Sequence, residues 1–248
     1  MIRFLVFFLF SFSLLAADLP TIQKQKKIRI AVDTTYPPME FESVDGKTIG
    51  LDIDWARELA SQLKVEAEFI TMPWDGILAG LKSDRYDIIM SSMNITPERE
   101  KEVNFVEYMA MGQVFVTKTG KPVVKTEKEL AGKIVAVQAD TTSSTALVNF
   151  QKKGIAIKKV LEFKGATETF AAVKSNHADV IIIDEAVGRY FSKLDPKTFT
   201  VSGTAITPLP IGIAVKKTDT ALLKALQTAV KTIKQNGTYA KVYKKWTN

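Results

Sequence analysis

Arg99 stands where a helix is expected to begin beside a bound anion. It belongs to the segment Ile95-Thr96-Pro97-Glu98-Arg99, in which Thr96 suits the N-cap and Pro97 the first helical position. Arg99 then lies in the first turn of the helix, where the helix dipole disfavours a cation. Arg99 is therefore favoured there when an anion binds both its guanidinium and the free backbone N–H groups. The alternative is a surface arginine paired with a nearby glutamate.

Asp184 is the second candidate for charge recognition. It follows the apolar run 179–183, and ligands bind at the carboxyl ends of parallel strands; the alternative is a simple N-cap aspartate. The segment 138–142 (QADTT) also follows a strand and opens a helix, so hydroxyl and N–H groups gather there. An arginine in the first half and a carboxylate in the second suit a zwitterion held between two lobes.

Two aromatic residues, Tyr36 and Trp74, stand at expected strand-to-helix turns. Packing in the core is the more common fate of tyrosine and tryptophan. Stacking on a flat or aliphatic ligand, or on a guanidinium, is the functional alternative.

Composition excludes most common enzyme chemistries. The 248 residues include no cysteine and one histidine, His177, which removes disulfides, zinc–thiolate sites, iron–sulfur clusters, cysteine nucleophiles and a lipid-anchoring cysteine.

Asp52 and Asp54 lie two apart on an expected helix, so they point to different faces; we interpret them as negative charge in a first turn. The chain lacks the glycine-rich nucleotide fingerprints and the nucleophile elbow. We expect no cofactor and no metal.

The positive charge of the chain does not indicate nucleic-acid binding. Lys and Arg number 34 against 27 Asp and Glu, a net charge of +7. The lysines are scattered, and the densest groups, 24–27 and 241–245, lie at the two ends, where charge is usually solvated.

Residues 1–17 (MIRFLVFFLFSFSLLAA) have the layout of a secretory signal peptide. A single positive charge, Arg3, precedes an apolar run and two small residues. The run is shorter than the roughly 20 apolar residues that span a bilayer. We therefore expect cleavage and an exported protein; an uncleaved anchor is the alternative.

The elements that must position these residues alternate along the chain. Periodicity predicts helices at 50–63, 74–81, 143–152, 167–174 and 184–191, and two more after 220. It predicts strands at 27–32, 65–70, 86–90, 112–117, 133–137, 157–163, 178–183 and 211–215. Such alternation indicates an α/β fold with mainly parallel sheets and helices on both faces. The pattern restarts near residue 115, which indicates two lobes.

In six segments taken in order, the chain resembles the periplasmic solute-binding proteins of polar amino-acid ABC transporters. These segments are 33–41 (DTTYPPMEF), 50–54 (GLDID), 91–99, 138–142, 178–184 and 236–239 (NGTY). The resemblance covers residues 27–246. It implies the type II periplasmic binding protein fold, in which two hinge strands, here near 111–117 and 203–212, join lobes that close on a ligand. Lobe 1 would comprise 18–113 plus 208–248, and lobe 2 residues 114–207.

The resemblance also implies roles for individual residues. Arg99 would hold the ligand α-carboxylate, Asp184 the α-ammonium, and Tyr36 and Trp74 would sandwich the side chain. Asp33 matches an acidic residue that meets the basic end of lysine, arginine, ornithine or histidine, although glutamine binders carry it too. Gln138 lies at a position linked to specificity. The remaining expected contacts are Ser91, Ser92, Asn94, Thr141 and Thr142.

Two positions depart from the pattern of the family. Asp140 stands where glycine is usual, which would strain the loop or bring charge near the cleft. Asn94 replaces the common serine or threonine. Neither removes the residues expected to hold the α-amino acid group.

The expected function is that of the periplasmic binding component of an importer, a monomer that passes a polar, basic amino acid to a membrane permease. One alternative is an enzyme like cyclohexadienyl dehydratase on the same fold. That family resemblance places a catalytic glutamate three residues after Asp184, where this chain has Val187, and Glu185 should point elsewhere. The other alternative is an exported sensor or adhesin.

Overall fold

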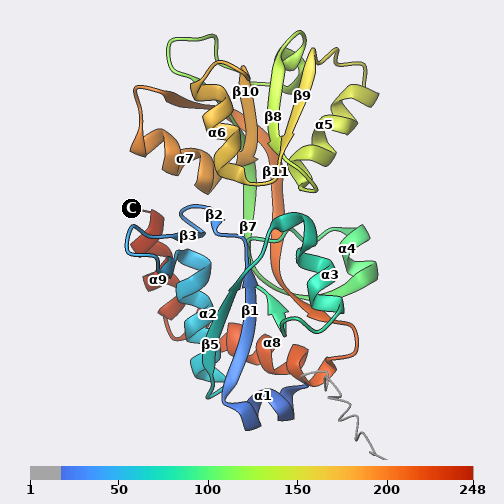
Figure 1. Cartoon of the computed structure of the whole chain (residues 1–248), viewed down its shortest axis with the longest axis vertical. Helices are drawn as coiled ribbons and strands as arrows, with labels where there is room; N and C mark the ends of the chain where they lie inside the picture. The colour runs from blue at the N-terminus through green and yellow to red at the C-terminus, as the bar shows by residue number, and fades with distance from the viewer. Residues whose placement is uncertain (1–17, 248) are drawn as a thin grey trace, which may run out of the picture.

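The structure is a computed structural model that describes residues 18–247, and the side chains of all of these except 204–207. The predicted signal peptide at 1–17 lies outside the described residues. An eight-stranded sheet runs through the molecule (Figure 1). Its strands, in spatial order, are β5 (Glu66–Thr71), β1 (Lys27–Val32), β6 (Ile88–Ile89), β11 (Phe199–Lys216), β7 (Val103–Lys118), β10 (Val180–Asp184), β8 (Ile134–Gln138) and β9 (Lys159–Phe163).

Two long strands at the centre of this sheet connect two groups of elements. β7 has 16 residues and β11 has 18, and they pair antiparallel along most of their length. The predicted strands 112–117 and 211–215 are therefore wrong in length. The extension of β11 contains Gly203, Pro208 and Pro210, and its pairing with β7 includes register shifts. Both obscure the alternation of polar and apolar residues that predicts a strand.

The two groups flank opposite ends of β7 and β11 (Figure 1). We refer to them as lobes 1 and 2; the boundaries at 113/114 and 207/208 fall inside the shared strands and stay a prediction. Lobe 1 contains α1 (Leu19–Gln25), α2 (Leu51–Gln62), η1 (Trp74–Gly76), α3 (Ile77–Lys82), α4 (Pro97–Glu102), α8 (Thr220–Gln235) and α9 (Thr238–Thr247). Lobe 2 contains η2 (Glu127–Leu130), α5 (Thr142–Lys152), α6 (Ala166–Lys174) and α7 (Glu185–Leu194).

Each lobe has the same mixed pairing. In lobe 1, β1 is parallel to β5 and β6, and β6 is antiparallel to β11. In lobe 2, β8 is parallel to β9 and β10, and β10 is antiparallel to β7. The predicted mixed, mainly parallel α/β architecture is confirmed.

Gly50 sets the start of α2 against a small second sheet. This sheet contains β2 (Thr35–Tyr36), β3 (Glu40–Glu42) and β4 (Thr48–Ile49). Gly50 has φ of 144°, and a Cβ there would lie 2.1 Å from the Met39 carbonyl oxygen. Only glycine fits, because its backbone accepts this φ and it has no side chain to collide. The first turn of α2 is thereby held against β3.

The C-terminal helices return to lobe 1. α8 buries Leu222, Leu226 and Ile233 among its apolar positions, and the ring of Tyr239 on α9 stacks on Trp55 of α2 at 4.3 Å between centroids. Burial of such large side chains supplies much of the favourable free energy of packing.

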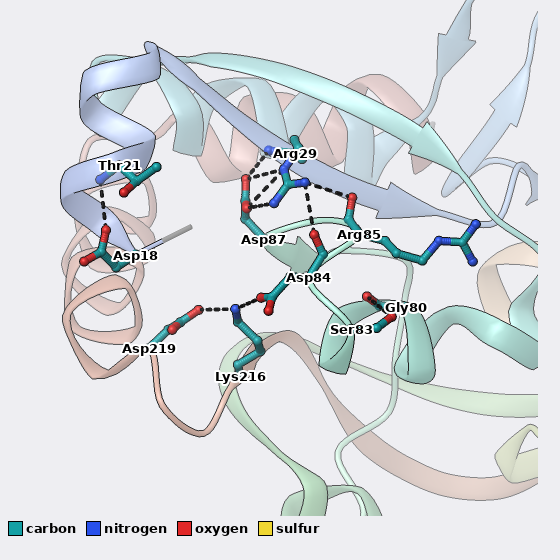
Figure 2. A network of polar contacts seen from close by, with 10 residues as sticks. All are labelled: Asp18, Thr21, Arg29, Gly80, Ser83, Asp84, Arg85, Asp87, Lys216 and Asp219. Carbon is teal, nitrogen blue, oxygen red and sulfur yellow. Dashed lines mark hydrogen bonds and ion pairs between the residues drawn. The ribbon is translucent and has the colours of Figure 1, made fainter. Parts of the chain in front are cut away.

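A polar network fixes the loop before β6 to the ends of two strands (Figure 2). Arg29 of β1 pairs with Asp87 at 2.7 Å and also donates to the backbone carbonyls of Asp84 and Arg85. Lys216, at the end of β11, pairs with Asp84 and, at 3.5 Å, with Asp219. These buried or half-buried charges pair with one another, so this network is structural.

None of the helices within residues 18–247 combines the length and apolarity that crossing a membrane requires.

Candidate ligand-binding site

A cavity lies between the lobes at the carboxyl ends of the parallel strands. The free space that it encloses in this structure is about 20 Å³, little more than one water molecule requires. Its lining includes every residue predicted for the site, namely Asp33, Tyr36, Trp74, Ser91, Ser92, Asn94, Arg99, Gln138, Thr141, Thr142 and Asp184. The structure thus brings together residues that lie far apart in the chain; their contacts with a ligand stay a prediction.

Arg99 is held at the start of α4 as the sequence predicts. Thr96 is the N-cap, and its hydroxyl accepts a hydrogen bond from the Arg99 N–H at 3.3 Å. The guanidinium donates to the carbonyl oxygens of Asn94 at 2.9 Å and Asp140 at 3.1 Å, and lies 5.3 Å from the Trp74 ring centre. Burial lowers the pKa of Arg99, while the charges of Asp184 and Asp140 act in the opposite direction.

Arg99 has no carboxylate partner within the described part of the chain at ion-pair distance. The alternative of a surface arginine paired with a nearby glutamate is therefore not what the structure shows. A half-buried cation that donates only to neutral carbonyl groups is electrostatically incomplete, and an anion in the cavity would complete it.

Asp184 lies at the end of β10, buried and opposite Gln113 of β7 in the sheet register. Burial raises its pKa to about 6, while hydrogen bonds from Tyr36 and Gln113 and the charge of Arg99 act in the opposite direction. Asp184 is the N-cap residue of α7, but its side chain makes no capping hydrogen bond. The N-cap alternative requires the carboxylate to bond to the backbone of the helix, and the Asp184 carboxylate does not do so.

Side chains and backbone from the two lobes meet across the cavity. Gln138 Nε2 donates to Asp33 Oδ2 at 2.7 Å, and Thr142 Oγ1 donates to Asn94 Oδ1 at 2.8 Å. The Trp74 indole N–H donates to the Asp140 carbonyl at 3.0 Å. The lobes are thus closed on one another in this structure. Burial raises the pKa of Asp33, against the effect of its hydrogen bond from Gln138.

A further contact between the lobes lies at the edge of the small sheet. The Ala166 backbone N–H, at the start of α6, donates to Thr35 Oγ1 at 3.0 Å. Gly165 is buried beneath it, and a Cβ on Gly165 would lie 3.3 Å from that of Thr35. The two chain segments therefore approach almost to backbone contact.

The structure explains the two departures from the family pattern. Asp140 has a left-handed φ of 57°, a conformation that favours glycine but that aspartate tolerates better than most residues. Its carbonyl oxygen faces both Arg99 and Trp74. Asn94 supplies the acceptor for Thr142, and its own Nδ2 has no partner among the described residues.

Three residues that line the cavity were missed, namely Glu40, Gln113 and Ser143. Gln113 is buried on β7 and donates to Thr142 Oγ1 at 2.7 Å, and its Oε1 has no partner in the described part of the chain. A single polar residue in the apolar run 111–116 was the signal available in the sequence.

Asp52 stands in the first turn of α2, as predicted, but it is an interior group and not a surface charge. Asp52 is fully buried, and its Oδ2 accepts hydrogen bonds from the Ser92 N–H and hydroxyl and from the Tyr108 hydroxyl. Asp54, in contrast, faces Arg57 and Lys245 at the surface. Among residues 18–247 no group of three histidine, aspartate or glutamate residues is arranged to hold a metal ion.

Comparison with protein families identifies the family to which this chain belongs. The family model described as bacterial extracellular solute-binding proteins, family 3, matches residues 28–248. The chain belongs to this family. The predicted resemblance is thereby confirmed at the level of the family.

Individual relatives agree with the assignment. The arginine-binding protein 1 of an ABC transporter of Escherichia coli K12 is 30% identical over 226 residues, covering 89% of this chain and 90% of that protein. An ancestral arginine-binding protein, solved with bound arginine, superposes with a TM-score of 0.85 at 35% identity, covering 90% and 99% of the two chains.

A third similar structure bears on the enzyme alternative. The ancestral amino-acid-binding protein AncCDT-1, described as a precursor of cyclohexadienyl dehydratase, has a TM-score of 0.86 and 37% identity, covering 93% and 99% of the two chains. The type II two-lobed fold is therefore confirmed, and the structures similar to it include binding proteins and an ancestor of an enzyme.

Proposed function

We propose that this protein captures a basic L-α-amino acid between its lobes and delivers it to the membrane permease of an ABC importer. The observation that carries the proposal is the uncompensated charge of the cavity. Arg99 lacks a carboxylate partner within the described residues, and Asp184 is a buried carboxylate in the same enclosure. A zwitterion would satisfy both.

The α-amino acid group fits these two charges in opposite directions. Its carboxylate would accept charge-assisted hydrogen bonds from Arg99 and from Asn94 Nδ2, which has no partner among the described residues. Its ammonium would lie at Asp184, where a positive charge lowers the pKa of the buried carboxyl. Closure of the lobes removes both ends from water, so each end needs its partner.

The basic side chain is proposed from Asp33. This buried carboxylate accepts hydrogen bonds from the neutral Gln138 amide and the Thr35 N–H, and no lysine, arginine or histidine within residues 18–247 pairs with it. The half-buried rings of Tyr36 and Trp74 would flank the methylene groups that separate the two charged ends of such a ligand.

Binding fits the site better than the dehydratase alternative. Val187, at the position expected for the enzyme's glutamate, is fully buried and apolar. Glu185 is paired with Arg189 at 2.6 Å and does not line the cavity. Neither residue supplies a general acid to the cavity.

Cleavage of residues 1–17 would release the protein into the periplasm, where we propose that it acts as a monomer. Its relatives include an arginine-binding protein of an ABC transporter and a histidine-binding periplasmic protein, which supports the same location.

Thermal unfolding of residues 18–248, refolded to remove bound ligand, tests the function. The panel is the twenty amino acids with ornithine, citrulline and prephenate. A ligand of the folded state raises the midpoint according to RT ln(1 + [L]/Kd). We expect a shift with arginine, lysine, ornithine or histidine. A shift only with neutral amino acids would reject the basic ligand, a shift with prephenate would favour the enzyme, and no shift would favour the sensor or adhesin.

A further inference from the structure

A pair of buried carboxyl groups lies at one wall of the ligand cavity, where Glu40 lines the cavity and Asp52 lies beside Ser92 and Tyr108. Glu40 on β3 is 1% exposed and Asp52 on α2 is 0% exposed. Gly50 brings the two elements together, since the N–H of Asp52 donates to the carbonyl of Met39, the residue before Glu40. Two carboxylates at this depth would carry two negative charges into a medium of low dielectric constant.

The hydrogen-bond donors around the pair satisfy only one oxygen of each group. Ser91 Oγ donates to Glu40 Oε1 at 2.7 Å. Asp52 Oδ2 accepts from the Ser92 N–H, the Ser92 hydroxyl and the Tyr108 hydroxyl at 2.7–3.0 Å. Glu40 Oε2 and Asp52 Oδ1 are buried without any partner in the described part of the chain. Such orphaned acceptors are costly, and the two groups lie near enough that the charge of Asp52 raises the pKa of Glu40.

The surroundings contain no cation, among residues 18–247, to compensate these charges. Glu40 is faced by Asp33, which follows β1, and by Tyr36 on β2. Asp52 is faced by Tyr108 on β7 and Tyr239 on α9. No lysine, arginine or histidine of the described chain pairs with either carboxyl group. The environment therefore favours loss of one negative charge.

We propose that Glu40 and Asp52 share one proton, held between Glu40 Oε2 and Asp52 Oδ1, and that the protonated pair positions Asp33 through Ser91. The proton turns the two orphaned acceptors into one donor and one acceptor. No oxygen of the pair is then left without a partner, and the pair carries a single negative charge. The same logic governs paired carboxyl groups that cannot both ionise.

Ser91 connects this pair to the cavity. Its hydroxyl donates to Glu40 and accepts the N–H of Asp33 at 3.0 Å. Glu40 is thus a positioning residue: it fixes the Ser91 hydroxyl, which fixes the backbone that carries Asp33. This second part of the proposal rests on the proposed function of Asp33, whereas the shared proton does not.

The proton has a defined effect on stability. Burial and the charge of Asp52 raise the pKa of Glu40 well above its usual range, and burial raises the pKa of Asp52 to about 6. Above the ordinary pKa of carboxyl groups, the folded state therefore binds more protons than the unfolded state. Stability contributed by the pair is complete below that pKa and is lost as pH rises toward the folded pKa.

Glu40→Gln tests the proton, with Glu42→Gln as the matched control, because Glu42 lies on the same strand and is exposed. The amide that Glu40→Gln introduces can donate to Asp52 without a titrating proton. In the wild-type protein one excess proton makes the unfolding equilibrium constant rise about tenfold per pH unit as the pH rises above the ordinary pKa of carboxyl groups toward the raised pKa values of the pair. Glu40→Gln should remove this proton's share of the slope, and Glu42→Gln should retain it.

Infrared difference spectra between the wild-type protein and each variant, recorded at neutral pH, detect the shared proton directly. We expect a carbonyl band of a protonated carboxyl group that Glu40→Gln removes and Glu42→Gln leaves. If the band is absent from the wild-type protein, or the pH slopes of wild type and Glu40→Gln coincide, the shared proton is rejected.

Ligand affinity tests the positioning of Asp33. We expect Glu40→Ala to weaken binding about tenfold at a temperature where it is folded, and Glu40→Gln to restore affinity close to wild type. Wild-type affinity in Glu40→Ala would overturn the positioning role. If no amino acid binds even the wild-type protein, the proposed function fails, while the infrared band and the pH slopes still decide the proton.

Discussion

Arg99 and Asp184 are charged groups of the cavity that lack partners of opposite charge in the described part of the chain. Each is removed from water to a large degree, and neither has an oppositely charged partner at ion-pair distance within residues 18–247. Leaving charges in this state costs free energy, and the α-amino acid group is the common metabolite feature that supplies both missing partners at a short separation.

Replacing Arg99 should therefore remove recognition of every α-amino acid. Removal of one partner from a buried charge pair costs about 2–5 kcal/mol, so Arg99→Ala should raise Kd by about 30-fold or more. Calorimetric titration with the ligand found by thermal unfolding measures this change. Arg57→Ala, on the surface of α2, is the control. An Arg99→Ala protein that binds normally would remove Arg99 from the site.

Replacing Asp33 should change selectivity instead. Asp33→Asn keeps the size of the side chain and an acceptor for the Thr35 N–H, but it removes the charge that faces a basic side chain. We expect affinity for arginine or lysine to fall more than about tenfold, with affinity for glutamine nearly unchanged. Competition binding of the two ligand classes measures the ratio, and an equal loss for both would contradict the assignment.

The candidate site could be predicted to the extent that its residues are marked locally. Arg99 and Asp184 follow expected strands and open expected helices, so position and residue type together revealed them. Asp52 and Gln113 were not recognised because their importance comes from burial. An acidic residue in a first turn and a glutamine in a strand are common at surfaces, and only tertiary packing turns them into interior groups.

At the scale of elements, the regular parts of the fold were readable and the shared strands were not. α2, α5 and α6 begin within about one residue of their predicted starts, since their apolar spacing is undisturbed. β7 and β11 could not be read at full length, because pairing between distant segments sustains strand structure through glycine and proline positions that interrupt the local pattern.

The junction of β3 and α2 gives a prediction about an element. Gly50→Ala places a methyl group against the Met39 carbonyl and demands an unfavourable φ, so it should lower the free energy of unfolding by about 2 kcal/mol or more. Denaturant titration measures the loss. Gly76→Ala, where a Cβ meets no atom within 4 Å, is the control. Equal stability of the two variants would show that the chain relaxes around Gly50.

At the scale of the whole molecule, the approach of Thr35 to Gly165 allows closure to be trapped. Disulfides have Cβ separations of about 3.5–4.5 Å, close to the 3.3 Å between these positions, and the chain has no other cysteine. We expect Thr35→Cys with Gly165→Cys to form a disulfide that links the lobes, faster with ligand than without.

Non-reducing gels after tryptic cleavage measure the link, and ligand release from the oxidised protein should be slowed by about tenfold or more relative to the reduced protein. Thr35→Cys alone is the control, since it can only cross-link two molecules. Equal oxidation rates with and without ligand would contradict ligand-driven closure.

The contact of Trp74 with Asp140 also makes the closure of the lobes detectable by intrinsic tryptophan fluorescence. Of three tryptophans, Trp55 is enclosed by Tyr239 and Tyr108 within lobe 1, and Trp246 is bonded to Asp54 of the same lobe. Trp74, in contrast, places its indole N–H on a carbonyl of the other lobe and its ring beside a guanidinium. Indole emission changes with polarity and nearby charge, so the colour and intensity of Trp74 fluorescence would follow each opening and closing without an attached dye.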